Sequence, residues 1–275
     1  MLLMAAIQMV SEPGIAANLA MAADLLAEAA GRGAQLAVLP ENFALMGRRE
    51  TDKLAVQEAP GVGPIQDFLA EQAARHRLWL VGGTLPLRTA DDGARVRAAC
   101  LLFNDRGQQV ARYDKAHLFD VQTPGSQERY AESATIEPGN RYIVADTPWG
   151  RLGLAVCYDL RFPDLFQALA ARGAEMIALP ASFTMQTGKD HWEVLCRARA
   201  IETETYFLAC GQTGSFQQGN ETRWTYGHSL VVDPWGHVVA KASDGVGVVS
   251  TRIDPARVKK VRAMIPVAQH KESFA

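Results

Sequence analysis

Apolar residues occur along this chain in short runs that alternate with stretches of helical periodicity. The N-terminal run MLLMAAIQMV predicts a first buried strand, because it is too short to cross a bilayer and has no charged leading region. The following stretch NLAMAADLLAEAA has apolar residues at the three- and four-residue spacing of an amphipathic helix. This alternation predicts an α/β protein.

The pattern is repeated in the second half of the chain. The segment AAGRGAQLAVLPENF (Ala29 to Phe43) matches LAARGAEMIALPASF (Leu169 to Phe183), each reading as a helix end, a Gly-Ala break, an apolar strand and a proline. Likewise, Ala99 to Arg112 resembles His228 to Lys241, and both carry a hairpin signature. The repeat predicts one internally pseudo-symmetric domain over residues 1–275, built as a four-layer α-β-β-α sandwich.

Composition and charge narrow the class of partner. The chain has 48% hydrophobic and 21% charged residues with a net charge of -2, which is typical of a globular protein with a large core. The sequence has no tract of lysine and arginine that would indicate a nucleic-acid or membrane surface, so we expect a small-molecule partner. Cys100, Cys157, Cys196 and Cys210 have no paired CxxC spacing, which favours free thiols in a reducing cytoplasm.

Three residues at the ends of predicted strands carry possible chemistry. Glu41 follows the strand QLAVLP, although its counterpart in the second half is Ala181; Cys157 ends the strand RLGLAV, and Lys115 follows the first hairpin. Taken singly, each fits a packing thiol or a solvated charge. Together they supply the nucleophile, the base and the cationic donor that acyl transfer needs.

Other catalytic constellations find less support in the sequence. His191 and Glu193 form an HxE, but no Pro-Cys-x-x-Cys follows it, so we expect no metal. No GxGxxG or phosphate loop is present, and we expect no organic cofactor. A papain-like pair of Cys157 with His117 or His228 stays open, although no motif links either histidine to the thiol.

In the settings LAVLPENF, RYDKAHLFD and GLAVCYDLRFPDL, the sequence resembles the nitrilase superfamily, the carbon-nitrogen hydrolases. The resemblance covers nearly the whole chain. It implies a cysteine amidase of α-β-β-α fold that forms a homodimer or a larger homo-oligomer and uses no cofactor. In that family pattern Glu41 is the base, Cys157 attacks the amide carbon, Lys115 and the backbone N–H of Tyr158 hold the oxyanion, and Glu132 orients the lysine.

Later blocks, among them YAES and YGHSLVVDPWG, look most like the deaminated glutathione amidase branch, with omega-amidase as the close alternative. The branch implies hydrolysis of deaminated glutathione to 2-oxoglutarate and cysteinylglycine, whereas an omega-amidase acts on 2-oxoglutaramate. We expect substrate contacts from side chains near the nucleophile, in the helix around residue 195 and in a long loop over 214–224. The candidates are Arg161, Ser182, Phe183, Arg197, Arg199 and Arg223.

Two interpretations from other classes remain. One is a ligand-binding or scaffold protein that has kept the fold but lost catalytic activity. The intact set of Glu41, Lys115 and Cys157 argues against this interpretation. An acyltransferase would pass the thioester to an amine, and members of that kind carry membrane segments that the sequence lacks. A hydrolase is favoured over both.

Overall fold

The computed structural model describes residues 1–90, 94–122 and 129–272. Within these residues the first sheet has seven strands in the order β15-β1-β2-β3-β5-β4, and β6 also pairs with β5. The strands are β1 (Leu2–Gln8), β2 (Leu36–Val38), β3 (Trp79–Val81), β4 (Leu85–Arg88), β5 (Val96–Phe103), β6 (Gln109–Asp114) and β15 (Gly247–Ile253). β1, β2 and β3 run parallel, so the residues that follow them gather at one edge of the sheet.

The second sheet has the order β14-β13-β10-β9-β8-β7. Its strands are β7 (Ile143–Thr147), β8 (Gly150–Leu154), β9 (Met176–Ala181), β10 (Tyr206–Gly211), β13 (Leu230–Val232) and β14 (Val238–Lys241). Here too the three central strands, β8, β9 and β10, run parallel. The two predicted hairpins are confirmed as the antiparallel pairs β5–β6 and β13–β14.

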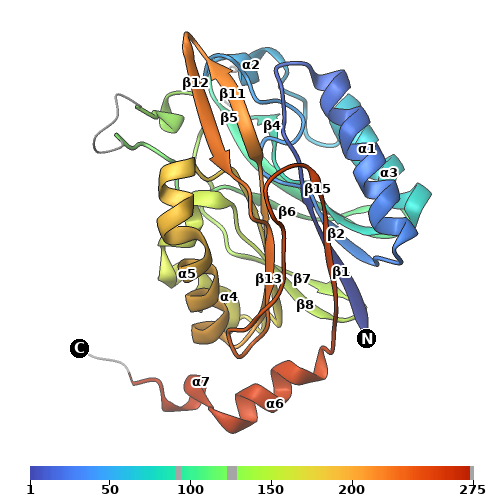
Figure 1. Cartoon of the computed structure of the whole chain (residues 1–275), viewed down its shortest axis with the longest axis vertical. Helices are drawn as coiled ribbons and strands as arrows, with labels where there is room; N and C mark the ends of the chain where they lie inside the picture. Colours follow the sequence, from blue (N-terminus) through green and yellow to red (C-terminus); the bar gives the residue numbers. More distant parts are fainter. Residues whose placement is uncertain (91–93, 123–128, 273–275) are drawn as a thin grey trace.

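Helices cover the outer face of each sheet. α1 (Ile15–Gly31) and α3 (Pro64–His76) pack on the first sheet, and α4 (Pro163–Ala171) and α5 (Met185–Thr203) on the second (Figure 1). In α1 the buried Ala22, Leu25, Leu26 and Ala29 follow the spacing of one helix face. The predicted four-layer α-β-β-α sandwich is confirmed. The remaining helices of the described residues are α2 (Asp52–Ala55), η1 (Glu132–Ala134), η2 (Cys157–Arg161), α6 (Ala256–Met264) and α7 (Val267–His270).

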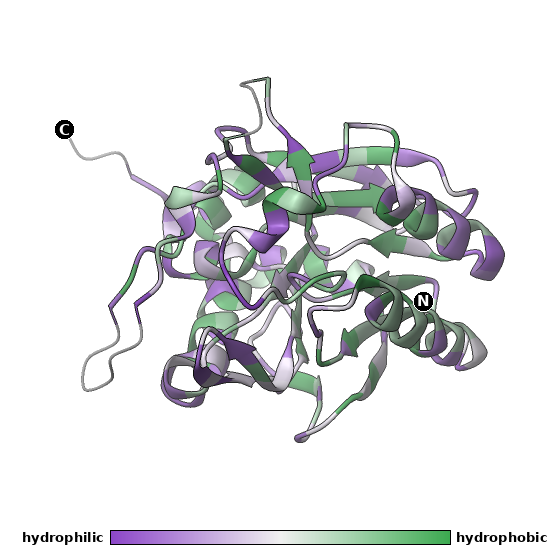
Figure 2. Cartoon of the chain, turned by 90° about the horizontal axis from the view of Figure 1, so that it is seen from above, coloured by the Kyte–Doolittle hydropathy of each residue, from purple (hydrophilic) through white to green (hydrophobic). Residues whose placement is uncertain are grey.

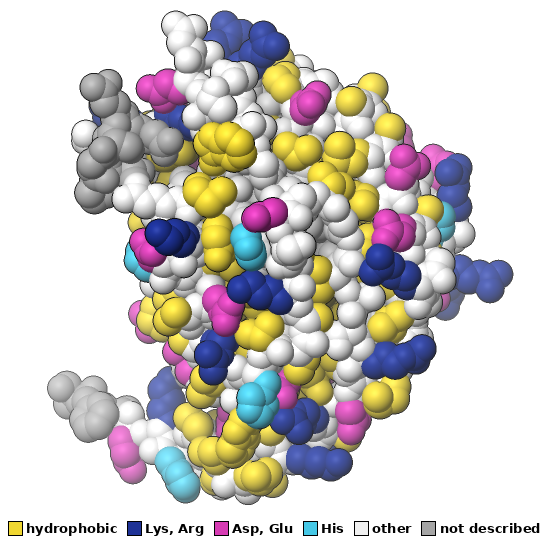
Figure 3. All heavy atoms as spheres, in the orientation of Figure 1, with side chains coloured by type: hydrophobic (Ala, Val, Ile, Leu, Met, Phe, Trp, Pro, Cys, Tyr) yellow, Lys and Arg dark blue, Asp and Glu magenta, His cyan; other side chains and the backbone are white. Residues whose placement is uncertain are grey.

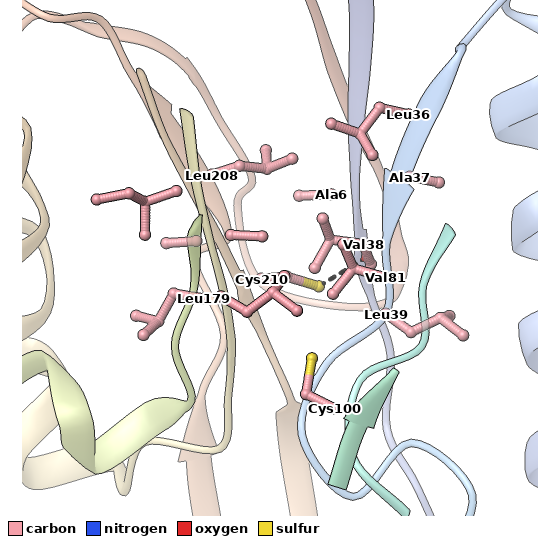
Figure 4. Packing of buried hydrophobic residues seen from close by; sticks show 14 of the residues in the cluster. Ala6, Leu36, Ala37, Val38, Leu39, Val81, Cys100, Leu179, Leu208 and Cys210 are labelled. Carbon is pink, nitrogen blue, oxygen red and sulfur yellow. Dashed lines mark hydrogen bonds between the residues drawn. The ribbon is translucent and has the colours of Figure 1, made fainter. Parts of the chain in front are cut away.

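The apolar faces of the two sheets meet in the middle of the molecule (Figure 4). Cys210 on β10 lies at this junction, where its thiol donates to the carbonyl oxygens of Ile7 at 2.8 Å and Val38 at 3.1 Å. Cys100 is equally buried, and burial raises its pKa. Because one hydrophobic cluster contains residues of both sheets, we propose that residues 1–275 fold as one domain.

The prediction of a loop over 214–224 is wrong, because this segment belongs to a β-hairpin. β11 (Thr213–Gln218) and β12 (Glu221–Tyr226) pair antiparallel, with Gln218 opposite Glu221 and a two-residue turn at Gly219 and Asn220. Gly219 has a φ of 61°, a value that glycine adopts at low cost and that tight hairpin turns require. The glycine and glutamine content suggested a loop, whereas alternating Phe216, Thr222 and Trp224 favour strands.

Hydrophobic segments are concentrated on strands and on parts of the covering helices, while hydrophilic segments are common on helix surfaces and loops (Figure 2). On the face seen in Figure 3, basic, acidic and apolar side chains are interspersed. Over the described ranges, no helix is both long enough and apolar enough to cross a membrane.

Candidate active site

Four residues from separate segments meet at one edge of the sandwich. Glu41 follows β2, Lys115 follows β6, Glu132 begins η1 and Cys157 begins η2. The Lys115 Nζ lies 2.8 Å from Glu41 Oε1 and 2.7 Å from Glu132 Oε2. The lysine is 1% exposed, so a cation is held between two carboxylates away from water. The structure therefore brings together Glu41, Lys115 and Cys157, which the sequence selected from separate segments, and Glu132, which the family resemblance added.

Burial alone would lower the pKa of Lys115, but the charges of Glu132 and Glu41 outweigh it and raise the pKa well above its usual value. The ammonium therefore stays protonated at neutral pH. A permanent positive charge at this position is suited to stabilising an oxyanion and unsuited to accepting a proton.

Cys157 has a φ of 47°, which places a non-glycine residue in the left-handed region at the turn from β8 into η2. Its Sγ accepts a hydrogen bond from the Ser182 N–H at 3.5 Å. Burial raises the pKa of the thiol well above its usual value, and the Glu41 carboxylate raises it further through its charge and a hydrogen bond, against the lowering by Lys115. The resting thiol is neutral, so attack by sulfur needs a base, and Glu41 is in contact with it.

Asp159 fixes the segment of the thiol and the segment of the lysine to each other. This fully buried carboxylate accepts from the Val156 N–H at 2.8 Å, next to the thiol. It also accepts from the Tyr113 hydroxyl at 2.7 Å and the His117 N–H at 3.1 Å, which flank Lys115. Sequence reasoning did not assign this role, although an acidic residue two positions after the nucleophile was its signal.

The backbone around Glu41 is held in a similar way. The Gln212 Nε2 donates to the Glu41 carbonyl oxygen at 3.0 Å, and the Asn42 N–H donates to Thr84 Oγ1 at 2.9 Å. Glu132 accepts from the Phe119 N–H at 2.7 Å, which fixes its carboxylate beside the lysine. Gln212 and Thr84 were missed because no local pattern distinguishes them from other polar residues after a strand.

Two cavities meet at Cys157. The larger is lined by the four residues of the cluster and extends to Glu50 and Lys53, while Trp224 and Thr225 of the hairpin form part of its wall. The smaller contains Tyr158, Arg161, Ser182 and Phe183. Ser182 and Phe183 thus lie beside the thiol as expected.

The predicted arginines separate into different environments. Arg161 lines the smaller cavity, and its guanidinium carbon lies 5.4 Å from the Phe183 ring centre. Arg199 is buried on α5, where it donates to the Leu160 carbonyl oxygen at 3.0 Å and pairs with Glu202.

The other two arginines also lie away from the thiol. Arg197 donates to the Gly236 carbonyl oxygen at 2.8 Å. Arg223 stacks on Tyr130 at 4.4 Å behind the wall of the larger cavity. Of the four predicted arginines, Arg161 lines a cavity at Cys157, whereas Arg197, Arg199 and Arg223 line neither of the two cavities.

The papain-like alternative loses its support at both histidines. The His117 Nδ1 is 2.7 Å from the Asp159 carboxylate and its ring stacks on Phe162 at 3.7 Å. The His228 Nδ1 is 2.7 Å from the Tyr226 carbonyl oxygen. Neither ring is among the residues that line the two cavities around Cys157.

This combination of sandwich and buried Glu-Lys-Cys cluster defines a class of hydrolase. The model of the carbon-nitrogen hydrolase family matches residues 3–263, and the chain belongs to that family. It is an enzyme that hydrolyses carbon-nitrogen bonds other than peptide bonds.

Relatives of known name narrow the class. The chain is 41% identical to deaminated glutathione amidase of Synechocystis over 272 residues, covering 98% of this chain and 97% of the relative. It is also 41% identical to the human deaminated glutathione amidase over 271 residues, covering 98% of this chain and 82% of the relative.

Solved structures agree with the fold. The NitFhit protein of Caenorhabditis elegans superposes with a TM-score of 0.88 at 37% identity, covering 98% of this chain, and this chain spans 64% of that fusion protein. A Saccharomyces cerevisiae member of branch 10 of the nitrilase superfamily superposes with a TM-score of 0.85 at 30% identity. The match covers 97% of this chain and 94% of that protein.

Proposed function

We propose that this protein is a cysteine amidase that hydrolyses deaminated glutathione to 2-oxoglutarate and cysteinylglycine through a thioester. The observation that carries the chemistry is the buried Lys115 between Glu41 and Glu132, beside a neutral thiol. The substrate follows from the two relatives of that name, which align over nearly the whole of this chain.

In the first half-reaction, Glu41 takes the Cys157 proton while Sγ forms a bond to the amide carbon. The carbonyl oxygen becomes an oxyanion held by the Lys115 ammonium and the Tyr158 N–H. Glu41 then gives its proton to the nitrogen as the C–N bond breaks, and the dipeptide amine leaves.

In the second half-reaction, Glu41 takes a proton from a water molecule that attacks the thioester carbon. The oxyanion forms at the same donors, and its collapse breaks the C–S bond and returns the proton to sulfur. Glu132 holds the Lys115 ammonium in place during both steps. We propose that Arg161, which lines the smaller cavity, pairs with the carboxylate of the 2-oxoglutaryl group.

The test is hydrolysis of deaminated glutathione and, separately, 2-oxoglutaramate by the purified protein and its Cys157→Ala variant. We expect the wild type to prefer the first substrate and the variant to lose at least about 10⁴-fold in kcat. Preference for 2-oxoglutaramate would replace the substrate by that of an omega-amidase. Undiminished turnover by the variant would contradict the mechanism itself.

We also propose a homodimer or larger homo-oligomer in the cytoplasm. Support for assembly comes from apolar side chains exposed on α5, Val194 at 67% and Ile201 at 49%. Support for a reducing compartment comes from the four cysteines, all of which are free thiols. Light scattering on the purified protein tests the assembly, which a monomeric mass would contradict.

A further inference from the structure

The two cavities at Cys157 differ in which catalytic groups they contain. Glu41 and Lys115 line the larger one, whereas Tyr158 and Arg161 line the smaller one. In the proposed reaction Glu41 protonates the departing nitrogen, so that nitrogen lies on the side of the larger cavity. The amine half of the substrate therefore extends into the larger cavity, and the acyl half extends towards Arg161.

Arg49, Glu50, Lys53 and Gln218 also line the larger cavity. The charged side chains of this set are more exposed than those of Lys115 and Glu41, so we call this part of the wall the mouth. Lys53 lies on the short helix α2, and its Nζ is 2.9 Å from Glu50 Oε2. The other oxygen of Glu50 accepts from the Gln218 Nε2 at 2.7 Å, which attaches this segment to the hairpin β11–β12 (Figure 1). The hairpin and α2 thus hold the lysine at a fixed place.

Glu50 is an ionised anchor for this lysine. Burial alone would raise its pKa, but the charge of Lys53 and the hydrogen bonds from Lys53 and Gln218 lower it, with a contribution from Arg223. An ammonium has three N–H donors. One hydrogen bond is described for the Lys53 ammonium, and its acceptor is Glu50 Oε2. The side chain of Lys53 is 19% exposed and lines the larger cavity, so it is a partly dehydrated cation in the wall of that cavity.

The larger cavity has two sets of charged groups. The set at Cys157 has Glu41, Glu132 and Lys115, two carboxylates and one ammonium. The mouth has Arg49, Glu50 and Lys53; Arg49 is paired with Asp52 at 3.1 Å and Lys53 with Glu50 at 2.9 Å. A carboxylate at the far end of an amine leaving group can accept from the Lys53 ammonium beside Glu50, whereas ammonia makes no use of this cation.

We infer that the mouth of the larger cavity binds the free carboxylate of the departing amine, with Lys53 as its cation and Glu50 as the residue that positions it. This inference rests on the proposed function. It makes Lys53 a specificity residue that favours an amino acid or dipeptide leaving group over ammonia. Substrates of both kinds share the acyl half, so the mouth is where they differ.

The test compares Lys53→Met and Lys53→Arg with the wild type on three amides. These are deaminated glutathione, the same compound with its glycine carboxylate converted to a carboxamide, and 2-oxoglutaramate. For Lys53→Met we expect kcat/KM on the first to fall about tenfold to a hundredfold, mainly through KM, with the other two unchanged. Lys53→Arg retains most of the activity because it keeps the charge.

The matched control is Lys241→Met, which removes the lysine of another Lys-Glu pair, with Glu193 at 2.7 Å. Lys241 is not among the residues that line the two cavities, so we expect Lys241→Met to leave kcat/KM unchanged on all three substrates.

An equal loss on all three substrates would mean that Lys53 only supports the local fold, and would overturn the inference. If the wild type cleaves deaminated glutathione readily, unchanged activity of Lys53→Met on that compound would overturn the inference as well. Failure of the wild type to cleave deaminated glutathione is a separate result, which removes the proposed function and the inference with it.

Discussion

The ends of β2 and β9 have the same scaffold and different chemistry. Each is a central parallel strand whose apolar run leads to a proline and then a phenylalanine, in LPENF and LPASF. Pro40 follows β2, whereas Pro180 and Ala181 are the last two residues of β9. After β2 the chain supplies Glu41 to the buried cluster, whereas the corresponding Ala181 is a fully buried methyl group. The next residue in the second half, Ser182, supplies only its backbone N–H to the thiol. The duplicated architecture thus provides the frame, and the difference between its halves provides the site.

The two hairpins repeat this lesson. The Asn104 Oδ1 accepts from the N–H of Arg106 and of Gln108, both at 3.0 Å. The Asp233 Oδ1 closes the second turn in the same way, accepting from Trp235 and His237 at 2.9 and 3.0 Å. The turns are equivalent, but the strand after the first turn leads to the buried Lys115, and the second leads to Lys241 on the surface.

Among the variants that compare the two halves, the largest effect is expected from removing the Glu41 carboxylate, which the second half lacks. Glu41→Gln keeps the shape and removes the base, so we expect kcat for hydrolysis to fall about 10²- to 10⁴-fold. Steady-state assays on deaminated glutathione measure this. A fall of less than about threefold would assign the base to another group.

The same variant has a second readout, which loss of folding would not produce. Glu41 raises the pKa of Cys157, so Glu41→Gln lowers it and increases the thiolate fraction at a given pH. The pH profile for alkylation of Cys157 by iodoacetamide therefore moves to lower pH in the variant. A profile that stays in place or moves to higher pH would contradict the contact between the carboxylate and the thiol.

A smaller effect, on stability, separates the two lysines. Lys115→Met leaves two buried carboxylates without their cation, and we expect the free energy of unfolding to fall by about 3–5 kcal/mol. Lys241→Met breaks a surface pair and is expected to cost at most about 1 kcal/mol. Urea titration of both variants measures the difference, and equal losses would mean that Lys115 is not a buried ion pair in solution.

The smallest effect is expected at the turns. Asn104→Asp keeps the oxygen acceptor of the first turn, so the free energy of unfolding should change by no more than about 0.5 kcal/mol. Asn104→Ala removes the acceptor and should cost about 1 kcal/mol. If Asn104→Asp costs as much as Asn104→Ala in a urea titration, the side-chain oxygen does not close this turn.

The sequence was sufficient for most of the fold because its signals are local. The alternation of helix and strand, the internal repeat and both hairpins depend on periodicity and turn residues within a few positions. Residues 214–224 suggest a loop in the sequence because Gly219 and the glutamines obscure the strand pattern of β11 and β12. The α-β-β-α layers followed from the repeat together with the family resemblance.

For the site, the sequence determined the identity of Glu41, Lys115, Cys157 and Glu132, but not their contacts. Lys115 and Glu41 are 74 residues apart, and their 2.8 Å contact exists because two sheets place separate strand ends at one edge. The fixing role of Asp159 and the position of Lys53 at the cavity mouth depend on the same packing. Local patterns select which groups are present; only the stacking of the sheets decides which charges are buried together, and burial gives them their chemistry.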